Sequence, residues 1–321
     1  MTPEQSTHLL IVGAGPAGLA CAVAARRAGL DHLVLDKGTI GDAIRRFPAN
    51  MTFFSTADLL EIGDVPFLSA GFRPTRFEAM RYYLRVAQAT GVTFRTGEEV
   101  QSIRPAGTGF RVETDRGAYA ARFVVVATGY YDTPNPYPVP GADLPHVHRR
   151  YGEPFQSFGK RVAIVGGRNS AVEMALELFR FGAHITLIHR GRSFSEGVKY
   201  WLLPDIENRI KAGEIHALFG TEIASITTGR LYLKGAHAGE IDADEVYVMI
   251  GYQPDPRLIA DAGVRVDAET LIPEHDPVTK ETNVPGLFVA GSIAAGRFNN
   301  RIFIENGRLH GATIVGAILK K

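Results

Sequence analysis

Glycines at fixed spacing near the start of the chain suit the binding of a dinucleotide. The run Gly13-Ala14-Gly15-Pro16-Ala17-Gly18 fits the pattern G-x-G-x-x-G. Here the first glycine permits a sharp turn, the second lets the backbone approach a pyrophosphate, and the third allows a helix to pack closely on a strand. Asp36 follows Gly18 by 18 residues, where a carboxylate can accept hydrogen bonds from a ribose diol. Together they predict a dinucleotide site rather than the glycine-rich turn of some other α/β domain.

A second, related turn lies near the middle of the chain. Its sequence is Gly166-Gly167-Arg168-Asn169-Ser170-Ala171, which keeps the first glycine and offers Ala171 for helix packing. Arg168 occupies the position of the middle glycine. It either reaches the nucleotide phosphates or keeps the nucleotide from its usual close approach. We predict a second dinucleotide site at this turn.

Basic residues follow the second turn where an acid follows the first. The next strand ends in His189-Arg190, Arg192 lies just beyond, and this strand end carries no acid. A ribose 2′-phosphate needs cationic donors, whereas a bare 2′-hydroxyl favours a carboxylate. The pattern therefore favours NADPH over NADH, and the alternative is a solvated basic loop. The candidate residues for the nicotinamide nucleotide are Gly166, Gly167, Arg168, Asn169, Ser170, His189, Arg190, Arg192 and Gly251.

Two other strand ends look like places where a flavin meets its protein. They are Thr128-Gly129 and Ala290-Gly291, and Ser292 stands where many flavoproteins place an aspartate for the ribityl chain. A helix beginning near Phe303 would aim its positive end at the flavin C2 carbonyl, and we give Glu305 no catalytic role. The candidate FAD residues are Gly13, Gly15, Pro16, Ala17, Gly18, Asp36, Lys37, Phe54, Val100, Ala127, Thr128, Gly129, Gly291 and Ser292.

Cys21 is the single cysteine of the chain. An internal disulfide and a four-cysteine metal site are thereby excluded, and we predict no metal. Because there is no C-x-x-C, electrons cannot leave a flavin through a dithiol within this chain. Cys21 lies four residues past Ala17 among alanines, which favours packing over thiol reactivity. Apart from the flavin itself, the catalytic groups are unknown.

The elements that must position these residues read as two β-α-β units. Apolar runs predict strands at 8–12 and 33–35 around a helix at 19–28. The same pattern recurs about 150 residues later, with strands at 161–165 and 185–188 around a helix at 172–181.

Two further strands, at 123–129 and 247–251, are each followed by a proline-containing link. A strand at 286–291 and a helix at 304–319 complete the chain. We therefore expect an α/β fold of two Rossmann-like, three-layer ββα domains. Residues 1–130 plus 252–321 would form the FAD domain, and residues 131–251 an inserted NAD(P)H domain.

Composition argues against several other classes of protein. The net charge is +1, with 45% apolar and 21% charged residues, so bulk charge gives no reason to expect binding to nucleic acid or a membrane surface. The apolar stretch 9–25 has no Lys or Arg before it and is interrupted by glycines. We interpret it as a buried strand and helix, and expect a soluble, cytoplasmic protein.

With these motifs in hand, the chain resembles the small thioredoxin-reductase-like flavoproteins, and within them the bacillithiol-disulfide reductase-like family. The resemblance implies FAD, NADPH, a nested two-domain architecture and a homodimer. In one respect the chain departs from that family. Members assigned to bacillithiol-disulfide reduction carry a cysteine directly after the proline of the first glycine turn, where this chain has Ala17. The similar segments are Met51–Thr56, Leu60–Asp64, Ala127–Asp132, Gly167–Glu173, His189–Gly191 and Ile302–Gly307.

These observations lead to an NADPH:acceptor flavin oxidoreductase as the main hypothesis. Hydride would pass from NADPH to flavin N5, and electrons then to a low-molecular-weight disulfide, a ferredoxin or a quinone-like acceptor. One alternative is a small flavin monooxygenase, with which His146 and His148 are compatible, although we interpret both as surface loop residues. A non-catalytic flavin redox sensor is the other alternative.

Overall fold

The computed structural model describes residues 5–321, which divide into two compact units. The first, here called the discontinuous domain, contains the described residues up to Thr133 together with Tyr252–Lys321. The second, here called the inserted domain, is Pro134–Gly251. The first boundary lies three residues later than the sequence suggests. Within residues 5–321, no helix has both the length and the apolar character needed to cross a membrane.

The discontinuous domain is built on a seven-stranded sheet in the order β3-β2-β1-β6-β5-β4, with β17 paired to β6. β3, β2, β1, β6 and β17 pair in parallel, whereas β4, β5 and the first half of β6 form an antiparallel meander. The strands are β1 (Gln5–Val12), β2 (His32–Asp36), β3 (Phe94–Thr96), β4 (Val100–Ala106), β5 (Gly109–Thr114), β6 (Ala118–Val126) and β17 (Leu287–Val289).

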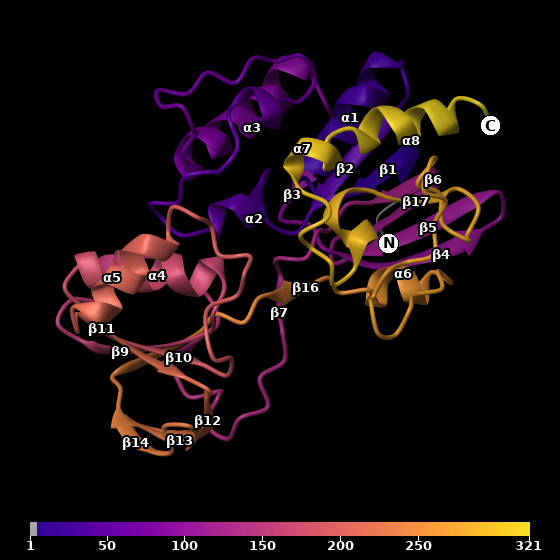
Figure 1. The fold of residues 1–321 in the computed structure, drawn as a ribbon. Helices are drawn as coiled ribbons and strands as arrows, with labels where there is room; N and C mark the ends of the chain where they lie inside the picture. The colour runs from indigo at the N-terminus through magenta and orange to yellow at the C-terminus, as the bar shows by residue number, and fades with distance from the viewer. Residues whose placement is uncertain (1–4) are drawn as a thin grey trace. The chain divides into compact units, whose positions relative to one another are not determined.

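Alternating side chains of β1 show how this domain is layered. Leu9 and Ile11 pack in the cluster that contains α1, α3 and α8, whereas Leu10 and Val12 pack in the cluster that contains the meander and α6. The parallel strands thus lie between a helical layer and a β-meander layer (Figure 1). The helices are α1 (Pro16–Arg27), α2 (Asp42–Arg45), α3 (Arg76–Thr90), α6 (Arg257–Asp261), α7 (Ile304–Gly307) and α8 (His310–Ile318), with 3₁₀ turns η1 (Asp58–Leu60) and η3 (Gly291–Ala295).

The inserted domain repeats this plan with a five-stranded parallel sheet in the order β11-β10-β9-β15-β8. One face packs on α4 (Asn169–Arg180) and α5 (Leu203–Lys211), and the other on an antiparallel sheet of three strands. The parallel strands are β8 (Val147–His148), β9 (Arg161–Val165), β10 (His184–His189), β11 (Ile215–Phe219) and β15 (Glu245–Val248). The others are β12 (Thr221–Thr227), β13 (Arg230–Gly235), β14 (Gly239–Asp242) and the 3₁₀ turn η2 (Pro154–Ser157). Two-residue strands β7 (Thr133–Pro134) and β16 (Tyr252–Gln253) pair with each other at the domain boundary.

The predicted α/β class with a three-layer core in each domain is confirmed. The ends of some helices and strands differ from prediction where the residues show no regular apolar periodicity. α1 begins at Pro16 rather than residue 19, because proline at the first helical position has the φ that a helix start needs. The helix predicted at 304–319 is two helices, α7 and α8. β6 begins five residues before the predicted strand, because its first half pairs in the meander.

The inserted domain also corrects our interpretation of one linker histidine. His148 lies on edge strand β8 rather than in a surface loop, and its ring centroid is 4.8 Å from that of Tyr247. Burial lowers the pKa of His148. Its packing role gives no support to the monooxygenase alternative.

Candidate functional site

The first glycine turn is closed where the protein needs contact and open where a ligand would approach. A Cβ on Gly13 would lie 2.6 Å from the Ala127 carbonyl oxygen, and a Cβ on Gly18 would lie 1.9 Å from the Gly13 oxygen. Both glycines are therefore required by the fold. A Cβ on Gly15, in contrast, would meet no atom within 4 Å among residues 5–321 beyond its chain neighbours. The middle glycine leaves bare backbone at the start of α1, as a pyrophosphate requires.

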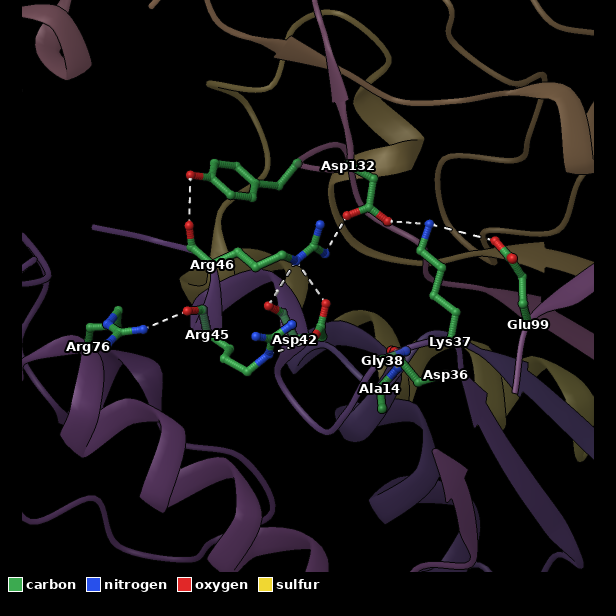
Figure 2. Close-up of polar contacts among 11 residues, drawn as sticks. Ala14, Asp36, Lys37, Gly38, Asp42, Arg45, Arg46, Arg76, Glu99 and Asp132 are labelled. Carbon is green, nitrogen blue, oxygen red and sulfur yellow. Dashed lines mark hydrogen bonds and ion pairs between the residues drawn. The ribbon is translucent and has the colours of Figure 1, made fainter. Parts of the chain in front are cut away.

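The carboxylate of Asp36 is held beside this turn by two backbone donors. Ala14 N–H donates to one oxygen and Gly38 N–H to the other, each at 2.7 Å (Figure 2). The loop after β2 is in turn tied back to the turn, because Gly41 N–H donates to the Ala14 carbonyl at 2.9 Å. Burial raises the pKa of Asp36 above its ordinary value. Each oxygen keeps a lone pair for a further donor, such as a ribose hydroxyl.

A charged network that the sequence did not predict extends outward from Asp36. Lys37 Nζ lies 2.8 Å from the Asp132 carboxylate and 3.8 Å from that of Glu99, and Arg46 donates to both Asp132 and Asp42 (Figure 2). Burial raises the pKa of Asp132, but hydrogen bonds from Lys37 and Arg46 outweigh it and leave that pKa lowered. Lys37, a candidate FAD residue, is thus already engaged with two carboxylates.

Parallel pairing gathers the other candidate flavin residues at one sheet edge. β1, β6 and β17 are adjacent and parallel, so their carboxyl ends lie together. A Cβ on Gly291 would lie 2.7 Å from the Ala17 Cβ, and one on Gly129 would lie 3.7 Å from the Ser292 hydroxyl. The turn after β6, the turn after β17 and the glycine turn are therefore neighbours. Thr128, in the same turn as Gly129, is exposed.

Two aromatic residues from distant segments meet at the start of α7. Phe54 and Phe303 pack edge to face with ring centroids 5.9 Å apart, and the neighbouring Ser55 hydroxyl donates to the Glu305 carboxylate. Phe54 is 42% exposed, so one side of its ring is accessible. Val100, also a candidate, is half-buried at the start of β4 and packs against the meander cluster.

The second glycine turn is as closely packed as the first at its first and last positions, but its middle position holds Arg168 in place of glycine. A Cβ on Gly166 would lie 2.6 Å from the Met249 oxygen and 2.9 Å from the Ala171 Cβ, as in the first turn. Arg168 is exposed, and within residues 5–321 its guanidinium makes no hydrogen bond or ion pair, although its carbonyl accepts from the N–H groups of Ala171 and Val172. The Asn169 side chain bonds the Gly197 carbonyl and the Lys199 N–H, each at 2.9 Å. Asn169 thus orders a loop with its side chain, while Ser170 is exposed.

The basic residues after β10 surround this turn. A Cβ on Gly167 would lie 2.5 Å from the His189 ring, so the imidazole rests directly on the turn. Burial lowers the pKa of His189, and Arg190 lowers it further. Arg190 and Arg192 are exposed, and neither guanidinium makes a hydrogen bond or ion pair in the described part of the chain. Gly251, after β15, has φ +90° and accepts a hydrogen bond from Asn135 N–H at 3.0 Å.

Cys21 lies fully buried on α1 and cannot serve as a surface thiol. Its exposure is 0%, and burial raises its pKa to about 12. The thiolate, which is the reactive form, is therefore absent at neutral pH. Between residues 5 and 321 no group of three or more His, Cys, Asp or Glu side chains is placed to hold a metal ion.

Comparison with known proteins decides the family. Residues 10–291 match the profile of the pyridine nucleotide-disulphide oxidoreductases. The chain belongs to this family. It is 39% identical over 315 residues to the bacilliredoxin reductase Bdr of Bacillus subtilis (strain 168), covering 97% of each chain.

Two solved structures extend this similarity to three dimensions. The bacillithiol disulfide reductase Bdr (YpdA) of Bacillus cereus matches at 40% identity with a TM-score of 0.96, covering 98% of this chain and 99% of that one. The Staphylococcus aureus protein of the same name matches at 36% identity with a TM-score of 0.95 and the same coverage. The expected resemblance to the bacillithiol-disulfide reductase-like family is confirmed. This family member is a flavoprotein oxidoreductase whose cofactors are FAD and a nicotinamide nucleotide.

Proposed function

We propose that the chain is an NADPH:acceptor oxidoreductase that binds FAD in the discontinuous domain and NADPH in the inserted domain. The observation that carries this proposal is the paired arrangement of the two glycine turns. Both turns have the same closed packing at their first and last positions. The strand after the first turn ends in the half-buried carboxylate of Asp36. The strand after the second turn is followed by Arg190 and Arg192. One domain therefore suits a dinucleotide with a free ribose diol, and the other a 2′-phosphate.

The residues of the discontinuous domain would bind and orient FAD. Bound FAD supplies hydride acceptance from the nucleotide and two-electron transfer to the acceptor. The bare backbone at Gly15 and the free N–H groups of the first turn of α1 would hold the pyrophosphate. Asp36 would accept hydrogen bonds from the adenosine ribose. The turns at Gly129 and Gly291–Ser292, which are neighbours, would contact the flavin half.

The acceptor must take its electrons without help from a thiol of this chain. The only cysteine is buried, and position 17, next to Gly291, is alanine. We propose a low-molecular-weight disulfide as the acceptor: NADPH, a proton and one disulfide yield NADP⁺ and two thiols. The names of the relatives make bacillithiol disulfide and bacilliredoxin the first acceptors to test. Ferredoxins and quinones remain the alternatives in the same screen.

Anaerobic titration tests the donor and then the acceptor. Purified protein should be yellow, and NADPH should bleach its flavin band at lower concentrations than NADH does. The reduced protein is then mixed with small disulfides, ferredoxin and quinones, and the return of the band identifies the acceptor. A colourless protein that takes up no FAD would contradict the proposal. A yellow protein that neither nucleotide bleaches would favour the redox sensor.

Replacement of Cys21 with alanine is expected to leave turnover unchanged. The thiol is inaccessible and protonated at neutral pH, so it takes no part in electron transfer. Loss of the buried sulfur should cost about 1 kcal/mol of unfolding free energy. Steady-state kinetics and thermal unfolding measure the two effects. A large fall in disulfide reduction with NADPH-driven bleaching intact would instead assign the thiol a redox role.

Assembly and location are part of the proposal as well. The family resemblance suggests a homodimer, and a chain with one cysteine suits a reducing cytoplasm. Light scattering on the holoprotein measures the first, and fractionation of the source cells the second.

A further inference from the structure

A buried histidine at the start of α8 bonds the backbone of a candidate flavin turn. His310 Nδ1 lies 3.1 Å from the Gly291 nitrogen. A peptide N–H can only donate, so Nδ1 is the acceptor and the ring proton belongs on Nε2. Gly291 is the first residue of η3, and its N–H is one of the donors that a helix start leaves without an internal partner. His310 therefore satisfies a buried donor of this turn.

The turn at Gly291 is closely packed on two further sides. Its φ is +71°, and a Cβ there would lie 2.7 Å from the Ala17 Cβ of the glycine turn. From the other side, a Cβ on Gly307 would lie 3.5 Å from the Gly291 Cα. The backbone of Gly291 is therefore confined between α1 and α7. The hydrogen bond to His310 sets the remaining degree of freedom, the orientation of its peptide plane.

The position of His310 is itself set by α1. A Cβ on Gly311 would lie 2.4 Å from the Ala20 carbonyl oxygen, so the start of α8 lies directly on the α1 backbone. α1 carries the glycine turn at its N-terminus. Through α8, the imidazole thus links the glycine turn to the turn after β17.

We propose that neutral His310 is a positioning residue of the flavin site, holding the Gly291–Ser292 backbone in the orientation that binds FAD. The proposal rests on the assignment of Gly291 and Ser292 to FAD made above. Asn and Gln substitutions at position 310 test which ring nitrogen matters. Asn Oδ1 would occupy the place of the imidazole Nδ1, whereas the Gln amide would reach toward the place of Nε2.

The surroundings of His310 keep its ring neutral at physiological pH. Burial lowers its pKa to about 4, and Lys280 and His275 act in the same direction. Other titratable side chains on or next to α1 and α7 include Cys21, Glu305 and Arg308. Cys21 is buried, Glu305 accepts from Ser55, and Arg308 donates to the carbonyls of Asp58 and Glu61.

Affinity of the apoprotein for FAD tests the proposal in three variants. His310→Asn should bind FAD within about threefold of the wild type, because an acceptor remains for the Gly291 N–H. His310→Gln and His310→Leu should each weaken FAD binding about tenfold or more, because a buried donor is left unpaired. Flavin fluorescence quenching measures the dissociation constants. His32→Asn, a change at another buried histidine of the same domain, on β2, should leave FAD affinity unaltered.

Equal affinity in the Leu variant and the wild type would overturn the proposal, as would equal weakening in the Asn and Gln variants. Neither outcome bears on the proposed function, which fails when the wild type takes up no FAD or when its bound flavin is bleached by neither nucleotide. The pH profile supplies a readout independent of FAD. The folded pKa of about 4 lies below the ordinary value of 6.5, so the unfolded state binds the extra proton between these values and wild-type stability falls as pH drops through that window. The His310→Asn variant should lack this component, and identical slopes would count against a neutral, acceptor imidazole.

Discussion

Replacing Gly15 with alanine is expected to remove most of the affinity for FAD while leaving the fold intact. A methyl group at this position meets nothing in the protein, so any penalty must come from the ligand. If the pyrophosphate lies on this bare backbone, the methyl group displaces it, and overpacking of this kind costs about 1–3 kcal/mol. FAD binding should therefore weaken by roughly tenfold to 100-fold. Calorimetric titration of the apoprotein measures the change, and its thermal unfolding shows that the fold persists.

Two other glycines serve as controls for this result. Gly316, inside α8, also has no atom of the described residues within 4 Å of a Cβ. Gly316→Ala should leave FAD affinity unchanged and stabilise the protein by about 0.5–1 kcal/mol. Gly18→Ala should instead destabilise the apoprotein, because the Cβ would overlap the Gly13 carbonyl oxygen. Unchanged FAD affinity in Gly15→Ala would remove the pyrophosphate from this turn.

Loss of both Arg190 and Arg192 is expected to reverse the preference between NADPH and NADH. Neither guanidinium is bonded within residues 5–321, so their removal breaks no contact of the fold. Hydrogen bonds to a charged group contribute about 1.5–3 kcal/mol each, and the loss of two of them predicts a rise of at least about 100-fold in KM for NADPH. KM for NADH, which has no 2′-phosphate, should change by less than about threefold.

A charge control is Arg230→Ala, which removes an exposed guanidinium, paired with Glu240 and Asp242, from β13 of the same domain. It should alter neither KM value, and therefore accounts for the general effect of lost positive charge. Stopped-flow reduction of the flavin by each nucleotide separates binding from hydride transfer. Parallel rises in KM for both nucleotides in the double variant would assign the arginines to a shared phosphate or to the solvated loop, and the preference for NADPH would need another source.

Much of the fold was predictable because its signals are local. The glycine turn, Asp36 and the apolar strands around them lie within about thirty consecutive residues. The residue types of each segment indicate the backbone conformation of that segment. The same holds for the second turn. The predicted starts of α1 and α4 were late, because the residues that begin these helices are small or polar and show no apolar period.

The candidate cofactor residues differ in how much of each side chain or backbone is left unpaired in the structure. Gly15, Asp36 and Arg190 present groups that are free to meet a ligand. Lys37 and Asn169 instead spend their side chains on neighbours within the protein. A sequence motif gives the position of a side chain along the chain. It does not give the protein groups that compete with a ligand for that side chain, because those groups belong to other segments that pack beside it in the fold.

Residue types and spacing alone determined that the chain has two dinucleotide turns, that an acid follows one and arginines the other, and that no thiol pair is present. Only the tertiary structure decided which residues hold those turns in place. Arg46 meets Asp132 across 86 positions, and His310 bonds Gly291 across 19. Such contacts depend on how strands and helices pack, and a histidine or arginine distant in the sequence carries no local pattern that reveals its partner.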